Sequence, residues 1–107
     1  MLFAWSVLAT AIASEIAATL SLKAAGNGSV PAIAIVVVGY AASVGLLMLA
    51  LKRIDVSIAY AAWAGTGTAV VALLGMTLLG ESASGLKVAS VALVIAGVVG
   101  LNLGGAH

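Results

Sequence analysis

Four long apolar stretches, separated by three short polar breaks, make up almost all of this sequence. Glycine, asparagine, proline and charged residues interrupt the apolar pattern at residues 23–31, 52–55 and 80–85. The stretches between the breaks predict helices near residues 2–23, 30–51, 57–79 and 86–104. Each is close to the roughly 20 residues that a helix needs to cross a bilayer. The pattern therefore predicts an all-α membrane protein, a single domain (1–107) of four transmembrane helices.

Composition narrows the class further. Of the 107 residues, 64% are hydrophobic and only 7% are charged, and the mean hydropathy is +1.35, far from the values of soluble domains. The absence of cysteine excludes disulfides and thiolate metal sites, and a net charge of +1 offers no basic surface to nucleic acid. No nucleophile–base pair, metal cluster or phosphate loop is present, so we expect neither an enzyme nor a metal or other cofactor.

One acidic residue, Glu15, lies midway along the first apolar stretch, where no other side chain from Leu2 to Leu22 is ionisable. A carboxyl group near the middle of a membrane is expensive to bury, and such groups usually face a bundle interior or an aqueous cavity. Glutamine would pack as well at lower cost, so packing alone does not account for the acid. An acid without a basic partner in its own helix indicates a site for a mobile cation or a proton.

The neighbours of Glu15 on its own helical face are mostly small. Those three, four or seven positions away are Ala11, Ile12, Ala18, Thr19 and Leu22. Small side chains let a ligand or another helix approach the carboxyl group, so the first four of these are candidate site residues. Helix packing is an equally good explanation for Ala11 and Ala18, and the Thr19 hydroxyl can bond either the acid or a backbone carbonyl.

Three of the five aromatic residues lie well inside predicted helices, Tyr40 in the second and Tyr60 and Trp63 in the third. Tyr60 and Trp63 are three positions apart and share a helical face. Aromatic rings beside a carboxylate form a site for lipophilic cations, because cation–π attraction adds to apolar contact. Ser43 shares a face with Tyr40, and we expect both hydroxyls within reach of the acid.

Small residues mark two further features. Gly65 and Gly67 follow Trp63 within one turn, where they permit either a close helix contact or a bend, and we treat them as candidate hinge residues. The fourth stretch has no aromatic residue and no charge after Lys87, so we expect a packing helix with one face toward a partner chain. The residues assigned to that face are Ser90, Leu93, Val94, Gly97, Val98 and Leu101.

The loop charges leave the orientation in the membrane undetermined. Lys52 and Arg53 lie on the side of the termini, and Lys23 and Lys87 lie on the other side. Because this count is even, the positive-inside rule favours neither orientation. Four short helices are also too few to shield Glu15 from lipid. A second copy of the chain would provide this shielding. We therefore expect an antiparallel homodimer in which two Glu15 carboxyl groups face one cavity.

Taken together, these residues resemble the small multidrug resistance (SMR) transporters, bacterial four-helix proteins, essentially from end to end. The resemblance rests on residues 14–20 with Lys23 closing the helix, on Tyr40 and Ser43, on residues 58–67, on residues 79–81 and on the pair Ala96-Gly97. The order Ala-Tyr-Ala-Ala-Trp-Ala-Gly-Thr-Gly, at this distance from a lone acid in the first helix, is its most specific part.

The resemblance implies a multi-pass protein of the bacterial plasma (inner) membrane that exchanges protons for small cationic compounds. It implies an antiparallel homodimer in which Glu15 binds protons and substrate in alternation, with Trp63, Tyr60, Tyr40 and Ser43 lining the site. Alternating access would come from exchange between two inequivalent protomer conformations, with Gly65 and Gly67 as the points that flex.

Two positions beside the acid distinguish branches of this family. Guanidinium exporters typically carry Trp one turn after the acid and Gly one turn before it, whereas this chain has Ala18 and Ile12. These residues indicate the branch that exports lipophilic or quaternary ammonium cations. The Gly-Glu-Ser sequence at 80–82 is similar to that of guanidinium exporters, so a guanidinium-type exporter is the first alternative. One subunit of a heterodimeric SMR pair is the second, and a non-transporting membrane subunit is the third.

Overall fold

The computed structural model describes residues 2–105, and every regular element in this range is helical. The helices are α1 (Leu2–Leu20), α2 (Leu22–Gly26), α3 (Val30–Ala50), α4 (Val56–Leu78) and α5 (Gly85–Gly105). α1 and α2 together form one span, Leu2–Gly26, so that four segments are long and apolar enough to cross a membrane. The prediction of an all-α membrane protein with four transmembrane helices is confirmed.

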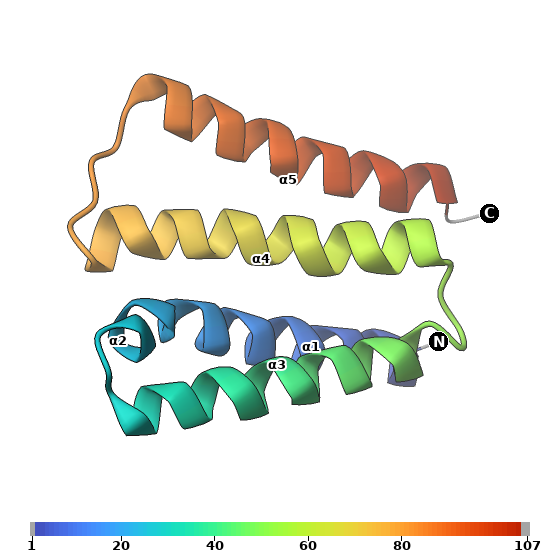
Figure 1. The fold of residues 1–107 in the computed structure, drawn as a ribbon. Helices are drawn as coiled ribbons and strands as arrows, with labels where there is room; N and C mark the ends of the chain where they lie inside the picture. The colour runs from blue at the N-terminus through green and yellow to red at the C-terminus, as the bar shows by residue number, and fades with distance from the viewer. Residues whose placement is uncertain (1, 106–107) are drawn as a thin grey trace.

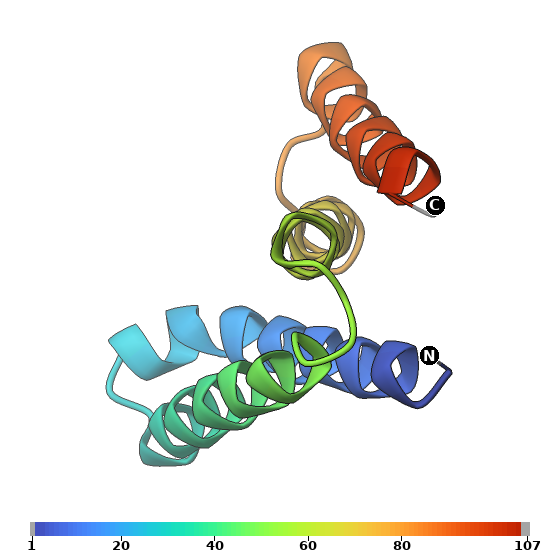
Figure 2. The ribbon, with the colours of Figure 1, turned by 90° about the vertical axis from the view of Figure 1, so that its right-hand side faces the viewer.

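The helices are arranged in three tiers. α1 and α3 lie side by side, α4 packs across them, and α5 lies beyond α4 (Figures 1 and 2). Within the described part of the chain, α5 contacts only α4, and none of its residues is buried. The principal extents of 45 × 34 × 16 Å describe a flat, open molecule. Long apolar side chains are exposed on all four spans, as expected of surfaces that meet lipid or another chain.

The first polar break is shorter than the sequence predicted. Residues 24–26, which were assigned to the loop alone, are helical and belong to α2. Ala24 and Ala25 are strong helix formers, so the helix continues for one more turn before the polar residues that follow end it. The chain leaves the helix at Gly28, whose φ of 92° is a conformation that glycine adopts without strain. Only residues 27–29 separate α2 from α3.

Capping interactions fix the ends of α3 and α4. Ser29 precedes α3, and its side-chain oxygen accepts a hydrogen bond from the Ala32 amide at 3.3 Å. At the end of α4 the chain turns at Gly80, which has a φ of 71°, and the Glu81 amide donates to the Gly75 carbonyl at 3.0 Å. This bond spans six residues, one more than in a Schellman cap, and it brings Glu81 back against α4.

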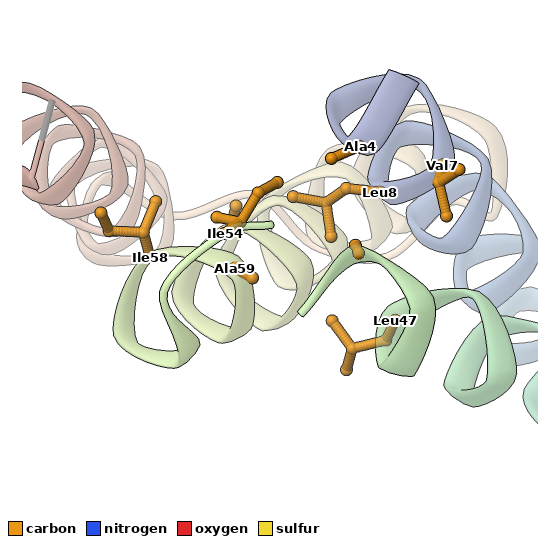
Figure 3. Packing of buried hydrophobic residues seen from close by; sticks show 9 residues of the cluster. Ala4, Val7, Leu8, Leu47, Ile54, Ile58 and Ala59 are labelled. Atoms are coloured by element: carbon orange, nitrogen blue, oxygen red, sulfur yellow. The ribbon is translucent and has the colours of Figure 1, made fainter. Parts of the chain in front are cut away.

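The buried apolar cluster lies at one end of the molecule, where α1 begins, α3 ends and α4 begins (Figure 3). Its members are Ala4, Val7, Leu8, Leu47, Ala50, Ile54, Ile58, Ala59 and Ala62. Ile12 and Trp63 pack against this cluster from deeper in the membrane-spanning region. The cluster therefore holds in register the three helices that carry the candidate site residues.

Candidate functional site

Glu15 is partly buried in the middle of α1, at the contact between α1 and α4. Gly67 of α4 lies so close to the carboxylate that a Cβ atom at this position would overlap Glu15 Oε2. Glu15 Oε1 accepts a hydrogen bond from Thr19 Oγ1 at 3.3 Å. Glu15 Oε2 is buried and has no hydrogen-bond partner among residues 2–105. Because buried polar atoms are nearly always satisfied, this oxygen needs an explanation.

One turn after Glu15, a hydroxyl pair joins α1 to α3. The Tyr40 hydroxyl lies 2.6 Å from Thr19 Oγ1. Thr19 has a single hydroxyl proton, so when it donates to Glu15 it must accept from Tyr40. The hydrogen bonds then run from Tyr40 through Thr19 to Glu15 Oε1. Tyr40 therefore reaches the acid only through Thr19.

One turn before Glu15, a second chain of hydrogen bonds joins α4, α3 and α1. Trp63 Nε1 donates to Ser43 Oγ at 2.7 Å, and Ser43 Oγ donates to the Ala11 carbonyl at 2.5 Å. Ser43 is fully buried, so both of its hydrogen bonds form away from solvent. The sequence predicted that the Ser43 hydroxyl lies within reach of the acid, whereas here it bonds a backbone oxygen and fixes the indole.

The two aromatic side chains of α4 form a tilted pair. The ring centroids of Tyr60 and Trp63 are 5.8 Å apart, with an angle of 41° between the ring planes. Trp63 is partly buried, whereas Tyr60 is 56% exposed. A pair of this kind offers both a ring face for a cation and apolar area for its substituents. Trp63 and Gly67 are one turn apart on α4, so the pair and the acid lie on neighbouring turns.

The structure places three of the candidate residues on α1 in helix packing. Ala11 and Ala18 are completely buried. A Cβ atom at Gly39 of α3 would lie only 2.9 Å from the Ala18 Cβ, so these small residues allow α1 and α3 to approach closely. Ile12 packs against the apolar cluster. The packing explanation that the sequence left open for Ala11 and Ala18 is therefore the one their surroundings favour.

The glycines of α4 serve close contacts in this conformation. α4 is a continuous helix from Val56 to Leu78, with no break at Gly65 or Gly67. A Cβ atom at Gly65 would overlap Val98 of α5, and Val94 lies next to it. Val94 and Val98, which were assigned to the partner face, thus pack on their own chain. The other residues of that assignment are exposed and are Ser90, Leu93, Gly97 and Leu101.

Sequence reasoning missed two features of the site. For Gly67 the sequence left open a close helix contact or a bend, and its close approach to the Glu15 carboxylate was not predicted. Gly39 was not singled out at all, although it is the residue that Ala18 packs on. Both depend on which helices are neighbours, and a single sequence does not carry this information. The only sign of the Gly39–Ala18 contact in the sequence was a small residue, Gly39, directly before Tyr40.

The site as a whole can bind a cation by charge and by contact with aromatic rings. Glu15 supplies the only carboxylate within the membrane-spanning segments of residues 2–105. Its Oε2 can take a proton or meet a positive charge. No group of three His, Cys, Asp or Glu side chains in the described range could hold a metal ion. Nothing in this arrangement provides a nucleophile with a neighbouring base.

Comparison with known proteins gives one family and several relatives. The family model described as Small Multidrug Resistance protein matches residues 3–94. Over 101 residues the chain is 46% identical to the multidrug resistance protein EbrB of Bacillus subtilis, covering 94% of this chain and 86% of that protein. Over 102 residues it is 42% identical to the guanidinium exporter of Yersinia pseudotuberculosis, covering 94% and 97%. It is also 44% identical over 102 residues to the nicotine metabolites export pump subunit NepA of Paenarthrobacter nicotinovorans, covering 92% and 86%.

Proposed function

This chain belongs to the Small Multidrug Resistance family of membrane exporters, and from this premise we propose that it exchanges protons for lipophilic or quaternary ammonium cations at Glu15. It is a multi-pass protein of the bacterial inner membrane, and its family transports small cationic compounds. The proposal adds three points to this: the coupled ion, the class of cation and the residues that bind it.

The observation that carries the proposal is the buried, unpartnered Oε2 of Glu15. A charged carboxylate in a low-dielectric site is costly unless a positive charge or a proton compensates it. One carboxylate cannot hold a proton and pair with a cation at the same time. Competition for this single group is therefore sufficient to couple the two fluxes, because binding of either one expels the other.

The surroundings of the acid favour large cations that do not donate hydrogen bonds. Guanidinium binds a carboxylate best through two parallel hydrogen bonds, one to each oxygen. Here Oε1 already accepts from Thr19, and Oε2 faces Gly67, so the two oxygens are not equally open. The Tyr60–Trp63 pair instead offers aromatic surface to a bulky cation.

A guanidinium-type exporter remains the alternative, because relatives of both kinds are similar to this chain. The two readings differ in the order of affinities. We expect tetraphenylphosphonium to bind the purified protein more tightly than guanidinium, measured as dissociation constants by calorimetry at one pH. Tighter binding of guanidinium than of tetraphenylphosphonium would assign the chain to the guanidinium branch instead.

We propose that the transporting unit is an antiparallel homodimer with two Glu15 side chains in one cavity. Four of the residues assigned to a partner face, including Leu93 and Leu101, are exposed on α5, and α5 has no neighbour but α4 among the described helices. One relative is named as a pump subunit, so a heterodimer is the alternative. Reconstitution of this chain alone separates the two, since a heterodimer half would not transport.

The experiment uses proteoliposomes that contain this chain alone, with an imposed proton gradient and a labelled quaternary ammonium compound. We expect the wild type to accumulate the compound against its gradient. The Glu15→Gln variant should fold and dimerise but accumulate nothing above empty vesicles. The matched control is Asp55→Asn, which removes an exposed carboxylate at the α4 N-cap that makes no capping hydrogen bond. Gradient-driven accumulation by Glu15→Gln would refute the mechanism.

A further inference from the structure

A second polar group lies far from Glu15, at the end of α4 where the chain crosses to α5. A cavity of about 380 Å³ opens there between the two helices. Its apolar lining comes from Ala72, Met76, Leu86 and Val91. Glu81 and Lys87 line the same cavity and are the two charged residues of this corner. The exchange mechanism proposed above uses none of these residues.

Of these two charged side chains, Lys87 bonds the backbone, whereas the Glu81 side chain makes no hydrogen bond within residues 2–105. The turn at Gly80 places Glu81 against α4, and a Cβ atom at Gly75 would lie 2.5 Å from Glu81 Oε1. The Lys87 ammonium donates to the Ser82 carbonyl at 2.8 Å and keeps two further protons for other acceptors. No ion pair joins the two side chains within residues 2–105. Opposite charges thus stand apart at one cavity, each with unused hydrogen-bonding capacity.

The position of this pair relative to the bilayer follows from the helices. Glu81 comes just after α4 and Lys87 belongs to the first turn of α5, so both lie at the ends of membrane-length segments. Ala72 and Val91 lie one to two turns further into these segments. The cavity therefore has charges of both signs at headgroup depth and an apolar part below them, where lipid chains are.

We propose that this cavity binds a zwitterionic phospholipid with a primary-amine headgroup, phosphatidylethanolamine. The phosphate would meet Lys87, the ammonium would donate to Glu81, and one acyl chain would fill the apolar part of the cavity. A single carboxylate and a single ammonium in one site complement a headgroup with one charge of each sign. An anionic headgroup would leave Glu81 uncompensated, and a choline headgroup has no proton to donate to it.

The bound lipid would fix α5 on α4. None of residues 85–104 of α5 is buried, and within the described chain this helix has only α4 to pack against. A lipid that touches Met76 on one helix and Val91 on the other bridges this contact. In the antiparallel homodimer proposed above, the two protomers would present the site to opposite leaflets.

The test is lipid binding by the full-length, detergent-purified protein, measured by native mass spectrometry. The lipids are phosphatidylethanolamine, phosphatidylcholine and phosphatidylglycerol with identical acyl chains. We expect the ethanolamine lipid to bind most tightly. Glu81→Gln should weaken this lipid about five-fold and leave the glycerol lipid no weaker, whereas Lys87→Gln should weaken all three about five-fold. Lys23→Gln, a loss of the same charge on the same side of the membrane, should change nothing.

A second variant tests the cavity itself. Ala72→Leu adds volume to the apolar part without altering charge, and it should reduce binding of the ethanolamine lipid while the protein stays folded by circular dichroism. Three results would overturn the proposal. One is equal binding of all three lipids by the wild type and Glu81→Gln. Another is an effect of Lys23→Gln as large as that of Lys87→Gln. The third is unchanged binding of the ethanolamine lipid by Ala72→Leu.

Discussion

Ser43 fixes the position of the Trp63 side chain, and we expect Trp63 and Glu15 to contribute differently to cation binding. The indole N–H is occupied by the Ser43 hydroxyl, which is itself anchored on the Ala11 carbonyl. The ring therefore offers its face rather than its hydrogen-bond donor to a ligand. In the proposed site Glu15 would supply charge, which every cation needs, whereas Trp63 would supply aromatic surface, whose value depends on the shape of the cation.

Removal of the Trp63 indole should therefore weaken cation binding and leave proton binding at Glu15 unchanged. We expect Trp63→Ala to weaken tetraphenylphosphonium binding by about 2 kcal/mol, or roughly thirty-fold, as for loss of one cation–π contact in a desolvated site. Proton competition at Glu15 needs no aromatic partner, so affinity in the variant should still fall as the pH is lowered. Calorimetric titration over a range of pH measures both effects.

The matched control for Trp63→Ala is Trp5→Ala, which removes the indole near the start of α1. Trp5 packs against the apolar cluster and lies more than two turns from Glu15 along the helix. Its loss should leave the cation affinity of the folded protein unchanged. Unchanged affinity in Trp63→Ala as well would make Trp63 a packing residue.

Gly67 gives a second prediction at this scale. A methyl group at this position would meet the Glu15 carboxylate, which is the movable end of a flexible side chain. Gly67→Ala should thus leave the fold intact and displace the carboxylate to another rotamer, weakening cation binding about tenfold. The control is Gly45→Ala, where the added methyl meets nothing within 4 Å. Equal affinity in the two variants would contradict the close approach of Gly67 to the acid.

Chemical rules single out candidate residues in the sequence, whereas the spatial neighbours of those residues are known only from the structure. A lone acid in an apolar stretch singled out Glu15, and mid-span aromatic residues singled out Trp63 and Tyr60; that these residues bind a cation stays a prediction. The hydrogen-bond partners of Ser43 could not be predicted from the sequence. Its hydroxyl could equally bond the acid, the indole or a backbone carbonyl, and only the register of α1 and α3 decides between them. For the same reason the sequence did not decide between a close contact and a bend at Gly67.

At the scale of elements, the contact between α1 and α3 depends on small residues. Gly39 faces Ala18, and its ideal Cβ would also lie 3.3 Å from the Ser14 carbonyl. Backbone atoms cannot move aside as a flexible side chain can, so this contact has little tolerance for added volume. The closeness also brings Tyr40, next to Gly39, within reach of Thr19.

A larger residue at Gly39 should therefore separate the helices. We expect Gly39→Leu to lower the free energy of unfolding in detergent by about 1–3 kcal/mol, the usual effect of overpacking. Gly45→Leu, on the same helix but in open space, should have little effect. The measurement is loss of helicity on titration with denaturant. Equal stability of the two variants would show that the α1–α3 contact can expand without cost.

The helix boundaries show what periodicity and breaker residues can predict. α4 and α5 begin and end within one residue of the predicted positions, because glycine and charged residues fall directly at their ends. The first helix was ended too early, at Lys23, since a charge in an apolar pattern was taken as a stop. A lysine in the last turn of a helix is instead favourable, and the chain continues to Gly26.

At the scale of the whole molecule, the single chain is open on one side. α5 lies apart from α1 and α3 (Figure 2), and its apolar residues are exposed along its length. An even distribution of Lys and Arg on the two sides favours no orientation, so two copies can insert in opposite directions and pair. The antiparallel homodimer stays a proposal, and the exposed face of α5 is where a partner chain would pack.

Orientation in the membrane can be measured directly. We expect single cysteines in the 27–29 and 52–55 connections to be labelled from outside the cell in roughly equal amounts, because the Lys and Arg counts balance. Two lysines added after His107 should bias the chain toward one orientation. Labelling of only one connection in the otherwise unmodified protein would refute dual topology.

Proton release on cation binding tests the central claim most directly, namely that one carboxylate serves both proton and cation. Tetraphenylphosphonium is added to the purified protein in weakly buffered detergent solution, and the pH change is converted to protons released per chain. The wild type should release protons in proportion to the cation bound, with the amount falling as the starting pH rises. Glu15→Gln should release none, and Asp55→Asn should match the wild type. Binding without release in the wild type, or equal release from Glu15→Gln, would contradict a shared site at Glu15.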